Sequence, residues 1–123
     1  MVVKTLLVVE DDSITREGLA LILCREGFAV VMAANGEEAL DCLRKNPDTD
    51  LILLDMLMPV LDGWHFLKCL KKMKKAAIPV IVTTGTILTR EWARDNGCAG
   101  YVRKPIEIDA LLEEIRRCLG PAN

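Results

Sequence analysis

Hydrophobic and polar residues alternate along this chain in blocks that repeat five times. Short runs rich in Val, Ile and Leu are typical of β-strands, and they occupy residues 4–9, 28–33, 50–54, 78–84 and 100–103. Each run is followed by an amphipathic segment with helical spacing, and these segments occupy residues 14–27, 36–46, 62–73, 89–97 and 107–120. Strands that alternate with helices predict a single α/β domain, in which five helices cover both faces of a five-stranded parallel sheet.

Capping residues support these boundaries. Asp12 or Ser13 can cap the first helix, and glycines stand where three helices should stop, at Gly27, Gly97 and Gly120. The first, third and fourth strands are apolar on both of their faces. This pattern indicates that they lie in the middle of the sheet.

The composition fits one compact domain. A chain of 123 residues with 51% hydrophobic and 28% charged residues can bury roughly two thirds of its unfolded surface in one core. The net charge of −2 gives no general attraction to nucleic acid or to an anionic membrane, so we expect neither as a partner. We interpret the lysines between residues 68 and 75 as the solvated face and end of a helix, with a docking patch as the alternative.

The cysteines and the hydrophobic runs bear on the cellular compartment. The five cysteines include no CxxC pair, and with a single histidine, His65, they offer no metal-binding spacing. Scattered cysteines of this kind fit a reducing compartment best. No apolar stretch reaches the ~20 residues of a membrane span, and the N-terminal segment turns acidic too soon for a signal peptide. We therefore expect a cytoplasmic protein.

Polar side chains follow four of the five predicted strands. The residues at these strand ends are Glu10, Asp11 and Asp12, then Asp55, then Thr84, and then Lys104. Ligands of open parallel sheets bind beyond the carboxyl ends of the strands, so these side chains should line one pocket. Each has a simpler explanation when taken alone, such as an acidic helix cap or a turn lysine. Their coincidence at one edge of the sheet indicates a functional site.

The residue types at this edge favour one kind of chemistry. Converging carboxylates repel one another unless a hard cation lies between them, and oxygen ligands beside a lysine suit Mg²⁺ better than zinc. A cation-bound carboxylate with a lysine and a hydroxyl nearby can act as a nucleophile toward phosphorus. The pattern therefore predicts that an aspartate accepts a phosphoryl group.

Four motifs carry a resemblance to a known family. They are "LLVVED", "LILLDMLMPVLDG", "IPVIVTTG" and "GYVRKP", in this order along the chain. With them the sequence resembles the receiver domain of two-component response regulators, of the chemotaxis type, over essentially the whole chain (residues 1–123). The resemblance implies a doubly wound, flavodoxin-like fold with strand order 2-1-3-4-5. It also implies a signalling domain and not an enzyme, with magnesium-dependent self-phosphorylation and self-dephosphorylation as its only chemistry.

The resemblance implies roles for the acidic residues. Asp55 would be the phosphorylated residue, and Mg²⁺ would be the cofactor. The protein ligands of the metal would be the carboxylates of Glu10, Asp11 and Asp55 and the backbone carbonyl of Leu57. Asp12 then lies outside the acidic pair of Glu10 and Asp11.

Further roles concern the phosphoryl group and the switch. Lys104 would hold one phosphoryl oxygen, and a hydroxyl at the end of the fourth strand would hold another. Side chains alternate along a strand, so only one of Thr83 and Thr84 can face the pocket, and the family offset from Pro79 selects Thr84. Tyr101 stands at the aromatic switch position, and a buried structural role for this tyrosine stays open.

Three local features follow from the comparison with the family pattern. The stretch 85–100 is shorter than in chemotaxis-type receivers, which leaves open the fourth helix and whether Trp92 is a core residue or a partner contact. The apolar side chain of Leu57 gives an attacking water no hydrogen bond. The peptide bond between Lys104 and Pro105 is expected to be cis.

The implied partners are proteins. The phosphodonor would be a sensor histidine kinase or a phosphotransfer protein, and the downstream target is unidentified, with a phosphorylation-dependent dimer as one option. The alternative function is a receiver-like interaction module that does not use phosphorylation. The complete set of Asp11, Asp55, Thr84 and Lys104 argues against that alternative. The sequence leaves open whether the chain stands alone or belongs to a longer protein.

Overall fold

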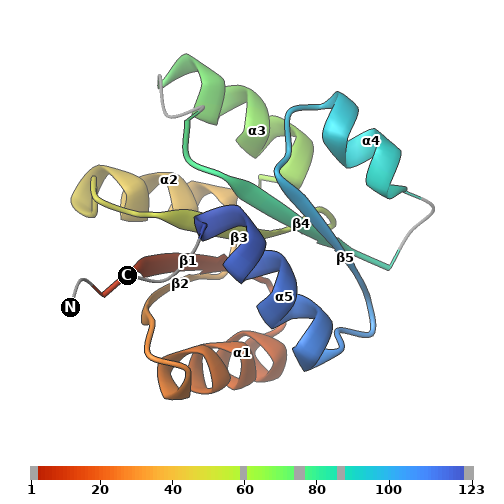
Figure 1. Cartoon of the computed structure of the whole chain (residues 1–123). Coiled ribbons are helices and arrows are strands. Elements are labelled where there is room, and N and C mark those ends of the chain that lie inside the picture. The colour runs from red at the N-terminus through yellow and green to blue at the C-terminus, as the bar shows by residue number, and fades with distance from the viewer. Residues whose placement is uncertain (1–2, 59–60, 74–76, 86–87, 121–123) are drawn as a thin grey trace.

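Strands and helices alternate along the structure as the sequence predicts (Figure 1). The computed structural model describes residues 3–58, 61–73, 77–85 and 88–120. The strands are β1 (Thr5–Val9), β2 (Ala29–Ala33), β3 (Leu51–Asp55), β4 (Val80–Thr84) and β5 (Gly100–Arg103). The helices are α1 (Ser13–Arg25), α2 (Gly36–Lys45), α3 (Gly63–Lys72), α4 (Arg90–Asp95) and α5 (Ile108–Leu119).

The strands form one parallel sheet in the order β2-β1-β3-β4-β5. This order confirms the fold that the resemblance implies. β3 and β4 are buried along their whole length, whereas most of β2 is exposed or half-buried because it lies at an edge. Val9 pairs with Leu54, and Asp55 pairs with Thr83, so the carboxyl ends of the central strands come together at one edge of the sheet.

Alternate residues of the strands build two hydrophobic cores, one on each face of the sheet. On one face, Ile52 and Leu54 belong to a core that includes buried side chains of α2, α3 and α4. On the other face, Leu51 and Leu53 belong to a core formed with α1 and α5. Figure 1 shows the two layers of helices on opposite sides of the sheet. The loops that follow the strands therefore form the accessible edge of the sheet.

Side chains cap the beginnings of four helices. Asp12, Asn35, Asp62 and Thr89 each accept a hydrogen bond from the backbone N–H three residues further on. Of the two residues predicted as the first cap, Asp12 therefore fills this position. Such caps satisfy N–H groups that have no partner within the helix.

The C-terminal ends of three helices, and the presence of the fourth helix, also agree with the sequence pattern. Gly27, Gly97 and Gly120 have positive φ angles of 94°, 79° and 79°, which other residues rarely adopt. The short segment between β4 and β5 does form a helix, α4, of six residues. Its Trp92 is half-buried and packs against the core. The core interpretation of Trp92 is therefore confirmed for part of this side chain.

The basic end of α3 lies on the surface. Lys68, Lys71 and Lys72 are exposed, as expected for a solvated helix face, and Lys74 and Lys75 lie outside the described residues. Within the described part of the chain, no helix has both the length and the apolar character needed to cross a membrane.

Candidate functional site

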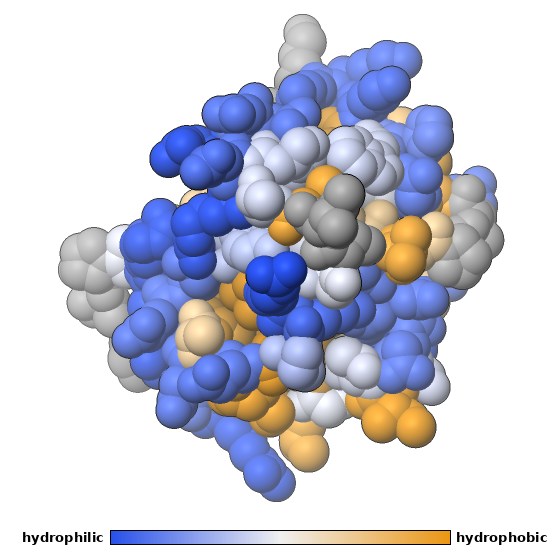
Figure 2. Space-filling model, turned by 90° about the vertical axis from the view of Figure 1, so that its right-hand side faces the viewer, coloured by the Kyte–Doolittle hydropathy of each residue, from blue (hydrophilic) through white to orange (hydrophobic). Residues whose placement is uncertain are grey.

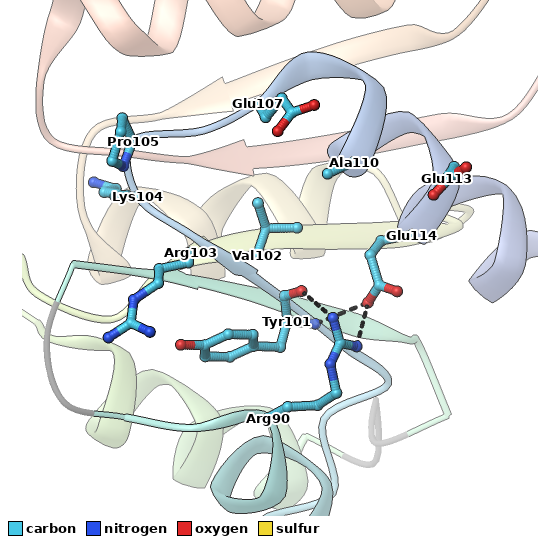
Figure 3. A pocket seen from close by; sticks show the side chains of 10 residues that line it. All are labelled: Arg90, Tyr101, Val102, Arg103, Lys104, Pro105, Glu107, Ala110, Glu113 and Glu114. Carbon is cyan, nitrogen blue, oxygen red and sulfur yellow. Dashed lines mark hydrogen bonds and ion pairs between the residues drawn. The ribbon is translucent and has the colours of Figure 1, made fainter.

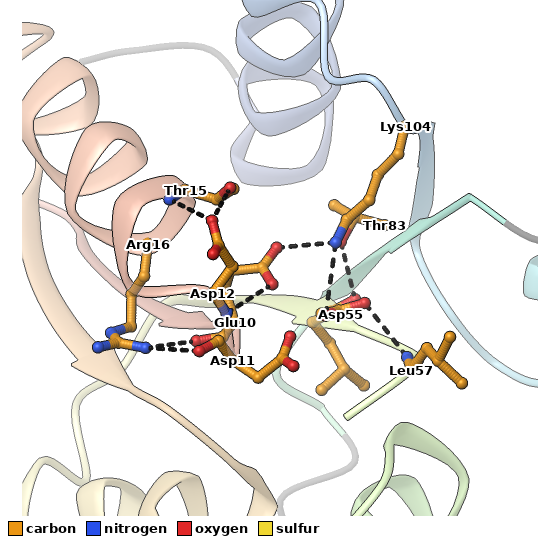
Figure 4. A network of polar contacts seen from close by, with 10 residues as sticks. Glu10, Asp11, Asp12, Thr15, Arg16, Asp55, Leu57, Thr83 and Lys104 are labelled. Carbon is orange, nitrogen blue, oxygen red and sulfur yellow. Dashed lines mark hydrogen bonds and ion pairs between the residues drawn. The ribbon is translucent and has the colours of Figure 1, made fainter. Parts of the chain in front are cut away.

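The ends of β1 and β3 bring three carboxylates together. Glu10 and Asp11 follow β1 directly, and Asp55 is the last residue of β3. One carboxylate oxygen from each of these three side chains lies within 4.8 Å of the other two (Figure 4). Glu10 and Asp55 are buried, whereas Asp11 is exposed. The predicted convergence of the acidic residues is therefore present, with its opening on the side of Asp11.

Lys104 reaches this acidic cluster from the end of β5. Its Nζ lies 2.9 Å from Oε1 of Glu10 and 3.4 Å from Oδ2 of Asp55 (Figure 4). The backbone N–H of Lys104 donates to the carbonyl oxygen of Thr84, which fixes the lysine beside β4. The peptide bond between Lys104 and Pro105 is cis, as predicted.

Burial and crowding make the charge of Asp55 unfavourable. The pKa of this carboxyl is raised from its usual 3.8 to about 7, mainly by burial and also by the hydrogen bond and the charge of the adjacent Glu10. The Leu57 backbone N–H and the Lys104 ammonium act in the opposite direction. Burial also lowers the pKa of Lys104, but its contacts with Glu10 and Asp55 outweigh this effect and raise the pKa overall.

The donor set suits a hard divalent cation. Three carboxylates in one cluster are the oxygen ligands that Mg²⁺ prefers, and no histidine or cysteine belongs to the cluster. A divalent cation bound beside the Lys104 ammonium would offset the repulsion between Glu10 and Asp55. The residues present therefore fit the metal that the resemblance implies.

The acidic turn after β1 is held by Arg16, a residue outside the pattern of polar strand ends. Arg16, in the first turns of α1, donates from NH1 to the carbonyl oxygen of Glu10 at 2.9 Å and to that of Asp11 at 3.3 Å. Asp12 turns away from the cluster, because its carboxylate accepts from the N–H and hydroxyl of Thr15. A basic residue shortly after the acidic turn was the available sequence signal. Arg16 thus orients the backbone that carries the acidic pair.

The loop after β3 is fixed close to Asp55. The backbone N–H of Leu57 donates to Oδ1 of Asp55 at 3.2 Å, while the Leu57 side chain is 72% exposed. Further along, the N–H of Gly63 donates to the carbonyl oxygen of Met56. A Cβ atom at Gly63 would lie only 2.8 Å from Cα of Met56, so the start of α3 packs directly on this loop. The role of the Leu57 carbonyl as a metal ligand stays a prediction.

Two buried threonines end β4. Thr83 pairs with Asp55, and its hydroxyl donates to the carbonyl oxygen of Leu54 at 3.5 Å. Thr84 is also buried, at 1% exposure. Since side chains alternate along a strand, Thr84 lies on the face of β4 that Val82 shares with the α2–α4 core. The choice of Thr84 as the phosphoryl contact stays a prediction.

Tyr101 is already packed inside the protein. It belongs to the same core as Val82, and its hydroxyl donates to the carbonyl oxygen of Leu88 at 2.7 Å. Its backbone N–H donates to Oε2 of Glu114, and Arg90 NH2 donates to its carbonyl oxygen (Figure 3). The structural interpretation of this tyrosine is therefore supported by its contacts, and its role as a switch stays a prediction.

A groove runs along β5, next to α5. It has a volume of about 390 Å³ and lies between β5 and α5, with Tyr101, Val102 and Glu114 among its walls (Figure 3). It is separate from the acidic cluster, although Lys104 contributes to both. On the side of the molecule where the strands end, hydrophobic residues form only small patches among hydrophilic ones (Figure 2).

Known proteins have amino-acid sequences similar to that of this chain. The polar-differentiation response regulator DivK of Brucella anthropi is 33% identical over 122 residues, which cover 97% of this chain and 98% of DivK. The probable transcriptional regulator ycf29 of Porphyra purpurea is 35% identical over 117 residues, which cover 93% of this chain but 56% of ycf29. The chain thus spans about half the length of the latter relative.

A solved structure and a family model agree with these relatives. The crystal structure of a putative response regulator from Chloroflexus aurantiacus has a TM-score of 0.85 and 33% identity, with 96% of this chain and 98% of that one covered. The family model of the response regulator receiver domain matches residues 6–116. The acidic cluster, the lysine after β5 and the sheet order therefore have one common explanation: the chain belongs to the response regulator receiver domain family.

Proposed function

We propose that this chain is a phosphoacceptor that takes a phosphoryl group on Asp55 from a phosphohistidine, in a Mg²⁺-dependent reaction. The family is one of signalling domains that work with histidine kinases or phosphotransfer proteins. The observation that carries the proposal is the buried carboxylate of Asp55, held 3.4 Å from Lys104 and beside Glu10 and Asp11. A buried carboxylate in such a cluster is costly for the fold, which favours a functional explanation.

The contacts of Asp55 suggest how Asp55 and Lys104 would act in the transfer. An oxygen of Asp55 attacks phosphorus as the bond to the imidazole nitrogen breaks, and the leaving imidazole keeps the bonding electron pair. Lys104 is close enough to turn its ammonium group from Oδ2 of Asp55 to an oxygen of the arriving phosphoryl group.

The metal would be held at the same cluster. Glu10, Asp11, Asp55 and the carbonyl of Leu57 would hold Mg²⁺, which when bound neutralises charge on the transferred group.

The phosphoryl group would then change the surface that binds a target. It brings roughly −1.5 to −2 charge units and new acceptor oxygens to the pocket. In our proposal the Thr84 hydroxyl binds one of these oxygens, and the loop between β4 and α4 moves with it. Tyr101, bonded to Leu88 in that loop, would follow and alter the surface of α4, β5 and α5. A downstream protein or a second copy of the chain would recognise the altered surface.

The five cysteines bear on where this reaction takes place. All five are free in the structure. Free thiols fit a reducing compartment, so the proposed location is the cytoplasm.

Intact mass measurement tests the proposed reaction. The parent chain is incubated with Mg²⁺ and acetyl phosphate, and an Asp55→Asn chain serves as the matched control. We expect one added phosphoryl group on the parent and none on the control. A parent chain that gains no mass would favour the interaction module without phosphorylation, and an equal gain on the Asp55→Asn chain would exclude Asp55 as the acceptor.

A further inference from the structure

Two tryptophans connect the first turns of α3 and α4. The ring centroids of Trp64 and Trp92 lie 4.6 Å apart, with the ring planes at 74°, which is an edge-to-face contact. They are the only two tryptophans in the chain. Trp64 is 44% exposed, which is high for so large an apolar side chain. Core burial alone therefore does not account for its position.

Trp64 is firmly tied to the loop that carries the acceptor. It follows Gly63, whose N–H donates to the carbonyl oxygen of Met56, the residue directly after Asp55. The close approach of Gly63 to Cα and Sδ of Met56 leaves no space between the helix start and the loop. A displacement of the backbone after Asp55 should therefore move the first turn of α3 as a unit, because closely packed segments transmit strain.

Trp92 is tied in a similar way to α4. Its backbone N–H donates to the hydroxyl of Thr89, the cap of this six-residue helix. Arg90, on the same helix, donates to the carbonyl oxygen of Tyr101 at 3.4 Å and to Oε2 of Glu114 at 3.3 Å. A movement of α4 would therefore reach both β5 and α5.

We propose that the Trp64–Trp92 contact is a second mechanical connection between Asp55 and the surface of α4, β5 and α5. It would act beside the connection through Thr84 and Tyr101, and it rests on the proposed phosphorylation of Asp55. Both tryptophans are positioning residues in this proposal, since they act through the helices that carry them. Edge-to-face contacts depend on ring orientation, so a small rotation of α3 would change the contact between the Trp64 ring and the Trp92 ring on α4.

Hydrogen exchange on the phosphorylated chain tests this connection. The parent, Trp64→Leu, Trp92→Leu and the double variant are each phosphorylated with acetyl phosphate and Mg²⁺, and intact mass gives the extent. Exchange is then followed across residues 88–103. We expect every variant to accept one phosphoryl group, and each single variant to lose roughly half or more of the parent's exchange response. The double variant should lose no more than the single variants, because all three remove the same contact.

Controls separate this role from a simple packing role. Trp64→Phe keeps an aromatic ring at the contact and should restore most of the exchange response. Leu21→Ala removes a side chain of similar exposure (54%) on α1 and should respond like the parent. Thermal unfolding of each variant shows whether it is folded at the temperature of the exchange measurement. A loss of stability without a loss of the exchange response would indicate packing alone.

Three outcomes would overturn the inference, and only the last of them also overturns the proposed function. If the parent responds and Trp64→Leu responds equally, or if the single losses add in the double variant, the connection through the tryptophans is wrong and the proposed function stands. If the parent gains no phosphoryl group, both the proposed function and the connection fail.

Discussion

Lys104 donates a charged hydrogen bond of 2.9 Å to Glu10, a residue 94 positions earlier in the chain. The contact joins the ends of β5 and β1 across the carboxylate of Asp55, which lies between them. Charge-assisted hydrogen bonds of this kind are stronger than neutral ones. The positive charge at this edge of the sheet is thus already shared between Glu10 and Asp55, and a phosphoryl group at Asp55 would compete for it.

The raised pKa of Asp55 predicts how stability depends on pH without a divalent cation. The folded chain keeps a proton on Asp55 up to about pH 7, whereas the unfolded chain loses it near 3.8. The free energy of unfolding should therefore fall as the pH rises between these values. Asp55→Asn should lack this part of the slope and be more stable by roughly 1–2 kcal/mol at neutral pH, after allowance for solvent screening.

Urea unfolding in the presence of a chelator measures this effect. Parent and Asp55→Asn chains are compared at several pH values between the two pKa values, and the parent is then compared with and without Mg²⁺. Added Mg²⁺ should stabilise the parent near neutral pH and leave Asp55→Asn nearly unchanged. An Asp55→Asn chain with the same pH slope as the parent would assign the slope to other groups.

A pair of glycine variants tests the packing of α3 on the loop that follows Asp55. Gly63→Ala should destabilise the chain by roughly 1–3 kcal/mol, because the new methyl group would overlap Met56. Gly18→Ala, in the middle of α1 with nothing within 4 Å of the added Cβ, should stabilise by roughly 0.5–1 kcal/mol. Denaturant unfolding of both variants gives the two values. If the two variants changed the free energy of unfolding equally, the loop and the start of α3 would adjust to the added methyl group without cost.

The exposed side chain of Leu57 predicts a slow loss of the phosphoryl group. It lies beside Asp55 and offers no hydrogen bond to a water that attacks phosphorus. Leu57→Asn, which adds such a group, should accelerate hydrolysis of the aspartyl phosphate by roughly several-fold. The decay of the phosphorylated mass after removal of acetyl phosphate measures this rate. Leu21→Asn, on the exposed side of α1, is the control, and a Leu57→Asn chain that decays like the parent would contradict the argument.

The fold and the acidic cluster were predictable because they depend on local patterns. The periodicity of the strands and helices fixes a parallel sheet, and parallel strands end at the same edge. Asp11, Asp55 and Lys104 could therefore be placed together from their positions at strand ends alone. The strand order came from the family resemblance, since periodicity does not determine it.

Contacts between distant side chains were not predictable in this way. Arg16 binds the carbonyl oxygens of the acidic turn, for which the sequence shows only that a basic residue follows the turn. Trp64 meets Trp92 across two helices, and no spacing in the sequence indicates that contact. Such pairs depend on rotamers and on the packing angle of neighbouring helices. The fourth helix was uncertain because its six residues contain too few turns for a clear period.

The two threonines that end β4 should play different roles. Thr83 pairs with Asp55, and its hydroxyl lies 3.5 Å from the Leu54 carbonyl oxygen inside the sheet. Thr84 lies at the strand end, on the face that leads to Tyr101, and its carbonyl binds the backbone N–H of Lys104. A hydroxyl that binds the phosphoryl group and moves the next loop should therefore belong to Thr84.

Replacement of each hydroxyl by a methyl group tests this assignment. Thr84→Val should still accept one phosphoryl group at Asp55, yet lose roughly half or more of the change in amide exchange between residues 88 and 105. Thr83→Val should keep the exchange response and lose at most about 0.5 kcal/mol of stability, because the hydroxyl contact that it removes is long for a hydrogen bond, at 3.5 Å. Intact mass, urea unfolding and hydrogen exchange give the three readouts. If Thr83→Val abolished the response and Thr84→Val did not, the register of the pocket on β4 would be wrong by one residue, and Thr83 would be the switch.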